Sequence, residues 1–169
     1  MLRGWPAPDL GQSALREAFL GFLDARPDAT KRSCVPGHIT ASAVVLSADL
    51  SSTLLTLHPR VRRWVQLGGH CEKKDDSIAA AALREATEES GIEGLVIDPS
   101  PVHLDVHPVT CSLGVPTRHF DVIFRVIAPA GAVPAISSES DDLRFWPVSA
   151  LPPETGDLTN AVGAALRRG

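Results

Sequence analysis

Three glutamates stand close together near the end of an alanine-rich stretch. The segment LREATEESGI, residues 83–92, carries Glu85, Glu88 and Glu89. On a helix these side chains share an arc of about 100°, beside an arc of alanine and leucine that would face a core. Like charges at this spacing repel, and carboxylates in a last turn oppose the helix dipole. A divalent cation would turn that repulsion into ligation, and Mg²⁺ and Mn²⁺ prefer such oxygen ligands. A solvated acidic face is the alternative.

The loop before this stretch adds glycines and further acidic residues. Gly68 and Gly69 are adjacent and let the backbone approach a ligand closely. Glu72, Asp75 and Asp76 follow, just before the predicted helix. One of the two aspartates can instead serve only as a helix cap, by accepting from free backbone N–H groups. The loop and the helix together strengthen the prediction of a cation site.

The order of these residues resembles the signature of the Nudix hydrolase superfamily, G-x5-E-x7-R-E-φ-x-E-E-x-G-φ, in which φ is apolar. The second half matches at every fixed position from residue 84 to residue 92. In the first half an aspartate replaces the usual glutamate. Asp75 keeps the spacing from Gly69, whereas Asp76 keeps the spacing to Arg84. We choose Asp76, because spacing inside a helix is rigid whereas a loop absorbs an insertion.

The resemblance implies hydrolysis of a phosphoanhydride bond. Members of the superfamily cleave a nucleoside diphosphate linked to another moiety, with Mg²⁺ and a water that attacks phosphorus. Such ions neutralise clustered phosphate charge and lower the pKa of bound water. Mn²⁺ is the alternative ion. Carried over to this chain, the metal ligands are Gly68 (through its carbonyl), Asp76, Glu85, Glu88 and Glu89, and Arg84 orients the glutamates by bidentate pairing.

The resemblance leaves two places for the general base. Glu85 ligates metal or acts as base in different members of the superfamily. The base also often stands on a later loop, where ISSESDDLRF offers Glu139, Asp141 and Asp142. We choose Glu139 if the base lies there, and a polar turn without a catalytic role is the alternative.

Histidine and aspartate alternate with apolar residues in two predicted strands. VHLDVHPV carries His103, Asp105 and His107, and RHFDVIF carries His119 and Asp121. The alternation places the polar residues of each strand on one face. That face either holds substrate or a further metal, or is the solvent side of a sheet. The six histidines and three cysteines show no spacing typical of a structural zinc site.

Strands outnumber helices in the expected fold. Amphipathic spacing predicts a helix over 13–25, a second over 77–90 closed by Gly91, and a last one over 157–168. Two β-compatible runs, 39–48 and 52–58, flank a polar turn and predict a hairpin. Further strands are expected at 62–67, 95–100, 102–109, 119–128 and 143–148, with breaks at proline and glycine.

These elements predict an α/β (α+β) protein with a mixed β-sheet between helices. The resemblance implies the Nudix α/β/α sandwich. We divide the chain into an N-terminal helical extension packed on the sheet, residues 1–37, and a Nudix hydrolase domain, residues 38–169.

The bulk composition excludes several classes of protein. The chain has 169 residues, of which 44% are hydrophobic and 21% charged, as in one globular domain. A net charge of -4 argues against general binding to nucleic acid or anionic membranes. No apolar run is long enough to span a bilayer, and we expect no signal peptide. The odd number of cysteines, at positions 34, 71 and 111, predicts free thiols in the cytoplasm.

The expected partner is a small-molecule nucleoside diphosphate derivative, and a homodimer is left open. The main rival is a module that has kept the Nudix fold to sense or bind nucleotides without turnover. The complete set of motif glutamates argues against that rival, and the altered aspartate keeps it open. Isomerisation of a prenyl diphosphate would need an active cysteine, and Cys71 lacks the expected flanking pattern.

Overall fold

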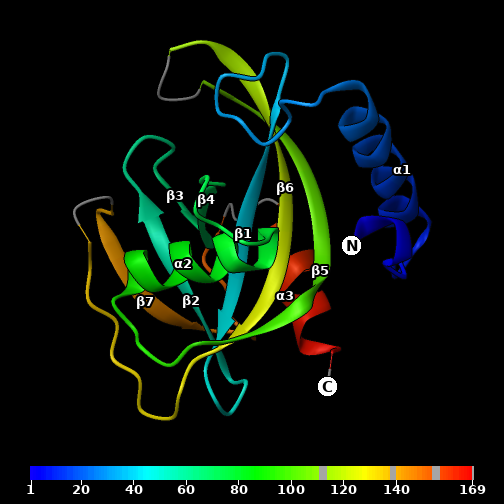
Figure 1. Ribbon diagram of the computed structural model, residues 1–169. Coiled ribbons are helices and arrows are strands. Elements are labelled where there is room, and N and C mark those ends of the chain that lie inside the picture. Colours follow the sequence, from blue (N-terminus) through cyan, green and yellow to red (C-terminus); the bar gives the residue numbers. More distant parts are fainter. Residues whose placement is uncertain (111–113, 138–139, 154–156, 169) are drawn as a thin grey trace.

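Strands from distant parts of the chain form one mixed sheet. The computed structural model describes residues 1–110, 114–137, 140–153 and 157–168. The described strands are β1 (His38–Leu46), β2 (Ser52–His58), β3 (Arg63–Val65), β4 (Leu67–His70), β5 (Val96–Thr110), β6 (Pro116–Ile127) and β7 (Asp142–Pro147). Their order is β3-β2-β1-β6-β5, and β4 also pairs with β1 while β7 also pairs with β2. Only the pair β1–β6 is parallel among these described strands (Figure 1).

Strand β1 is the centre of the sheet, and all nine of its residues are buried. It meets β2 through Val45 opposite Leu54, as the predicted hairpin requires. The single strand expected over 62–67 was wrong. The chain there divides into β3, which pairs with β2, and β4, which pairs with β1. This change of neighbour brings Gly68 and Gly69 beside the centre of the sheet.

The break expected near residue 101 was also wrong, because β5 runs continuously past its prolines. Its pairing with β6 shifts register on both sides of Pro101. Such a bulge leaves a residue unpaired, and β5 is an edge strand, where a missing N–H costs no ladder bond. The bulge therefore accommodates Pro99 and Pro101 within the strand.

Helix α2 (Ile78–Ser90) covers one face of the sheet. The Ser77 side chain accepts from the Ala80 N–H at 3.1 Å, and Gly91 ends the helix at φ +63°. Its buried residues are all small, and three of them are the alanines Ala81, Ala82 and Ala86. They pack against Ala41 and Ala43 of β1 and allow a close approach of helix to sheet.

Helix α3 (Leu158–Leu166) covers the opposite face. It packs against Val44, Leu46 and Ile123, which alternate along their strands with the residues that face α2. The α/β/α sandwich with a mixed sheet is therefore confirmed. None of the helices within the described ranges combines the length and apolar character needed to cross a membrane.

Helix α1 (Leu10–Ala25), preceded by a 3-10 turn (Leu2–Gly4), lies beside β5 (Figure 1). It begins earlier than expected because Asp9, not Ser13, caps it by accepting from the Gln12 N–H at 2.8 Å. Phe22 stacks on Phe120 of β6, with ring centroids 4.1 Å apart, and Phe19 meets the same ring edge-on. This segment thus packs on the sheet, while the division of the chain at residue 37 stays a prediction.

Candidate active site between α2 and β4

Arg84 lies at the centre of the acidic cluster and holds it together. Its Nε and Nη2 donate to the two carboxylate oxygens of Asp75, at 2.9 and 3.0 Å. Its Nη1 donates to Glu85 at 2.9 Å and to Glu88 at 3.0 Å. Nη2 also donates to the His70 carbonyl, which fixes the helix to the end of β4. One guanidinium therefore orients three carboxylates and one strand.

The pair of Arg84 and Asp75 is largely removed from solvent. Their side chains are 13% and 6% exposed. Hydrogen bonding to Arg84 lowers the pKa of Asp75, so this aspartate is ionised at neutral pH. The same bonds raise the pKa of Arg84 above its usual value. The charges at the centre of the cluster are thus fixed over the physiological range.

Glu85 and Glu89 lie against the two glycines of β4. The Gly68 N–H donates to Glu89 Oε2 at 3.1 Å. A Cβ atom on Gly69 would stand 2.7 Å from the Glu85 carboxylate, so only glycine leaves room for it. At Gly68, φ is +155°, and a Cβ atom would stand 2.6 Å from the Ser42 Cα. Gly69 thus lets the Glu85 carboxylate lie against the strand, and Gly68 lets β4 lie close to β1.

The remaining predicted residues lie in different surroundings. The Glu88 side chain is 54% exposed, and Lys74 Nζ lies 3.8 Å from Glu88 Oε1. Asp76 is exposed, so the structure brings Asp75 rather than Asp76 into contact with Arg84. Glu139 lies outside the described residues.

These oxygen donors fit a hard divalent cation. Glu85 and Glu89 lie against β4 at Gly69 and Gly68, and Arg84 links Glu85 to Glu88. Carboxylate and carbonyl oxygens are the ligands that Mg²⁺ and Mn²⁺ select. Glycine at position 69 lets the Glu85 carboxylate lie directly against β4. The arrangement can therefore bind a cation and present it to a phosphate group.

The predicted row of histidine and aspartate occupies the other face of the sheet. Asp105 is opposite Asp121, and His107 is opposite His119, so the register confirms that they share one face. Val122 and Phe124 alternate with these residues and pack in the clusters on the α1 and α2 side. The face is not simply solvated, since Asp121 is 2% exposed.

Asp121 is the most buried acid of this face. It accepts from Thr40 Oγ1 at 2.8 Å, from Ser42 Oγ at 2.9 Å and from Gln66 Nε2 at 3.2 Å. Burial raises the pKa of Asp121, and the two hydroxyl bonds oppose that rise. These three bonds fix the position of the Asp121 carboxylate.

Two further histidines lie on this face: sequence reasoning did not single out His38, and it placed His70 in the loop before the helix rather than in a strand. His38 is opposite His119 across the parallel pair β1–β6, and His70 is opposite Thr40 across β1–β4. The alternation of His38, Thr40 and Ser42 was a signal that could have found the first of them. His103 lies apart from this row, where it contacts Gln12 and Asp157 beside α3.

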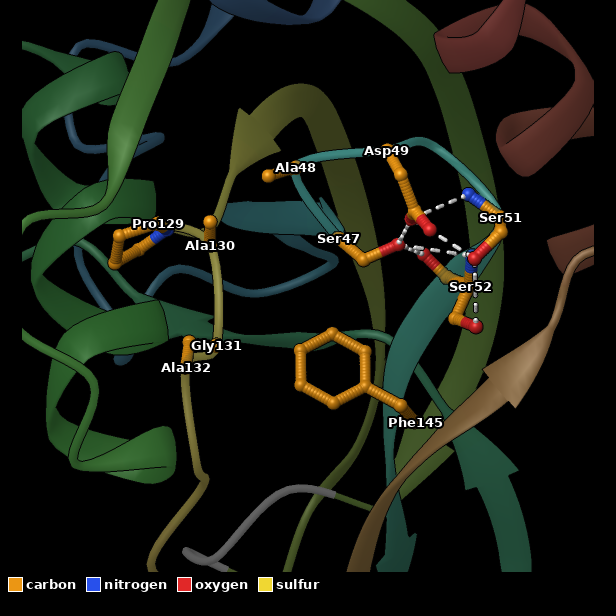
Figure 2. A pocket seen from close by; sticks show the side chains of 10 residues that line it. All are labelled: Ser47, Ala48, Asp49, Ser51, Ser52, Pro129, Ala130, Gly131, Ala132 and Phe145. Atoms are coloured by element: carbon orange, nitrogen blue, oxygen red, sulfur yellow. Dashed lines mark hydrogen bonds between the residues drawn. The ribbon is translucent and has the colours of Figure 1, made fainter.

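A separate pocket of about 320 Å³ lies where β1 turns into β2. Phe145 stands between the turn at residues 47–52 and the segment 129–132 (Figure 2). No motif residue lines it. We therefore assign it no part in the site at α2.

Comparison with known proteins identifies the family. The family model of the NUDIX domain matches residues 36–165. No curated protein matches the sequence. A NUDIX-family hydrolase from Clostridium perfringens has a similar fold, with a TM-score of 0.59 and 21% identity over 78% of this chain and 98% of that chain.

Two further solved structures share the fold. The NUDIX domain of Shewanella oneidensis NrtR complexed with ADP ribose gives a TM-score of 0.60 at 17% identity, over 88% of this chain and 97% of that chain. An Ap4A hydrolase from C. elegans gives a TM-score of 0.55 at 16% identity, over 76% of this chain and 95% of that chain. The domain match covers most of the chain and includes the whole segment from Gly68 to Ile92. The chain therefore belongs to the Nudix family of hydrolases, which act on phosphoanhydride bonds.

Proposed function

We propose that this protein is a metal-dependent pyrophosphohydrolase that cleaves a nucleoside diphosphate linked to another moiety by attack of water at phosphorus. The observation that carries the proposal is the position of Glu85 and Glu89 against Gly68 and Gly69, with Arg84 bonded to the same cluster. Carboxylates packed so closely to the backbone are costly unless a cation offsets their charge.

The chain's own residues divide the work between binding and orientation. Gly68 (through its carbonyl), Glu85, Glu88 and Glu89 would hold Mg²⁺ or Mn²⁺. A bound ion supplies positive charge to the pyrophosphate and lowers the pKa of a water. Arg84 keeps Glu85 and Glu88 in position. Asp75 anchors Arg84, and we now favour it over Asp76 for the acidic position of the first half of the motif.

The general base is Glu85 or Glu139 in this proposal. Glu85 is the better supported of the two, because its carboxylate lies at Gly69 and receives a bond from Arg84. A group bonded to a guanidinium is a weak base, so Glu85 would need Arg84 to release it as substrate binds.

The proposed substrate is a small nucleotide derivative with an internal pyrophosphate. Similar folds include a domain complexed with ADP ribose and an Ap4A hydrolase, and both names denote such compounds. The free thiols Cys34 and Cys71 support a reducing compartment, and we place the protein in the cytoplasm. Light scattering would decide between a monomer and a homodimer.

A panel of nucleotide derivatives tests the proposal. Each compound is incubated with the protein with and without Mg²⁺, and the products are identified by mass. In H₂¹⁸O, attack at phosphorus puts the label in a phosphate product. Binding of a compound without turnover, under all metal conditions, would support the sensing module instead.

A further inference from the structure

Three imidazoles from three strands converge on the face of the sheet opposite α2. His38 comes from β1, His70 from β4 and His119 from β6. One nitrogen of each lies within 4.8 Å of the others. The ring centroids are 4.9, 5.0 and 5.2 Å apart. Backbone pairing of these strands, rather than a loop, sets the positions of all three.

Hydrogen bonding accounts for only part of this arrangement. His38 Nε2 and His70 Nε2 are 3.0 Å apart and share one proton. His119 Nε2 is buried and has no hydrogen-bond partner among the described residues. A buried ring nitrogen without a partner is unfavourable, and polar groups in this state often mark a missing ligand. The unpaired His119 Nε2 therefore indicates a ligand that the protein itself does not supply.

The spacing suits a transition-metal ion. Zn²⁺ binds imidazole nitrogen at about 2.0–2.1 Å, so two tetrahedral ligands stand about 3.3 Å apart. The three nitrogens lie within 4.8 Å of one another, so they must approach by up to about 1.5 Å to reach that distance. Imidazole nitrogen suits Zn²⁺, Cu²⁺, Fe²⁺ and Ni²⁺, whereas Mg²⁺ takes oxygen ligands.

We propose that His38, His70 and His119 form a binding site for a divalent transition-metal ion, with Zn²⁺ as its probe. The site is separate from the carboxylates of α2, because it lies on the other face of the sheet and has nitrogen ligands. It does not rest on the proposed function. Three protein ligands leave one coordination position for water or a bound anion.

Arg32 opposes the ion in the metal-free protein. Its Nη2 lies 2.9 Å from His70 Nδ1 and donates to it, so the proton of the neutral ring stands on Nε2. An ion on Nε2 displaces that proton to Nδ1, and Arg32 must then turn away. Arg32 is exposed, so a rotated guanidinium would remain in solvent. Its loss should therefore tighten binding.

Calorimetry and metal analysis after removal of metal with a chelator test the site. We expect one Zn²⁺ per chain in the wild type and a loss of affinity of at least about 100-fold in His119→Gln and in His70→Gln. Arg32→Gln should bind severalfold more tightly. Co²⁺ gives a second readout, since its visible absorption reports four-coordinate nitrogen ligation. Circular dichroism verifies that each variant is folded.

Glu89→Gln separates this site from the α2 site. It should keep the Zn²⁺ and Co²⁺ signals while it loses Mg²⁺-dependent hydrolysis. His103→Gln, which changes a histidine outside the cluster, is the matched control and should bind as the wild type does. Three outcomes would overturn the proposal. The first is no Zn²⁺ binding in the wild type, and the second is wild-type affinity in both His70→Gln and His119→Gln. The third is loss of the Zn²⁺ and Co²⁺ signals in Glu89→Gln.

Discussion

Arg84 and Asp75 meet through two hydrogen bonds, of 2.9 and 3.0 Å, although eight residues separate them in the sequence. The pair joins the loop after β4 to the second turn of α2. Loss of one partner leaves the other charge largely buried. We expect Asp75→Asn to lower the free energy of unfolding by about 2–3 kcal/mol. Urea titration measures this change, and Asp76→Asn, at an exposed position, should stay within about 0.5 kcal/mol of the wild type.

The negative charges of α2, rather than the sizes of its side chains, should determine catalytic activity. Glu88→Gln and Glu89→Gln keep the side-chain size and each remove one carboxylate of the proposed metal site. We expect kcat to fall by at least about 100-fold in each, because such ligands fix the ion that stabilises transition-state charge. Melting temperatures within a few degrees of the wild type would show that folding is preserved. Wild-type rates in both variants would contradict the proposed function.

The glycines of β4 should differ in what their substitution disturbs. In Gly69→Ala the new methyl group meets the far end of Glu85, which can move. We expect folding to persist while activity falls by about tenfold to 100-fold. A displaced Glu85 carboxylate would move the proposed metal ion away from its reactive position. In Gly68→Ala the methyl group meets the backbone of Ser42 at φ +155°. Stability should then fall by about 1–3 kcal/mol. Thermal melts beside activity assays separate the two effects.

Acid should weaken the fold before the carboxylates titrate. Burial lowers the pKa of His70 from 6.5 to about 4 and that of His119 to about 3. Below pH 6.5 these histidines bind protons in the unfolded chain but stay neutral in the folded chain. The free energy of unfolding therefore falls from about pH 6.5 toward pH 4. Chelator-treated wild type and His119→Gln are compared by urea unfolding across this range. The free energy of unfolding should change less steeply with pH in His119→Gln than in the wild type. Equal slopes would show that His119 does not cause the loss of stability in acid.

Helix α1 should contribute to the stability of the whole sheet. Phe19 is fully buried and contacts Phe120, so Phe19→Ala opens a cavity within the core. We expect a loss of about 3–5 kcal/mol. A single cooperative urea transition, shifted as a whole, would support one folding unit. A separate early transition would instead show that α1 unfolds independently.

Local signals made α2 predictable. Ser77 caps it, Gly91 ends it, and its alanines face the core as their spacing requires. The choice between the aspartates depended on rigid helical spacing. Because the helix begins at Ile78, Asp75 and Asp76 both lie in the preceding loop, where that spacing does not hold. The sequence thus located the cluster but could not select the aspartate that contacts Arg84.

Long-range pairing was beyond sequence reasoning. His38, His70 and His119 meet because β1 is parallel to β6 and antiparallel to β4, in one register. A shift of one residue would turn every side chain of a strand to the other face. Alternation revealed which residues of a strand face together, but the order of strands depends on the whole core.

The family match begins at residue 36, but three side chains that shape this end of the sheet come earlier. Phe19 and Phe22 cover Phe120, and Arg32 reaches His70. A chain trimmed to the family boundary would therefore expose an aromatic ring to water and change the protonation of a neighbouring histidine. Assays and crystals of such a shortened protein would report on a different surface, so work on this enzyme should retain its first 35 residues.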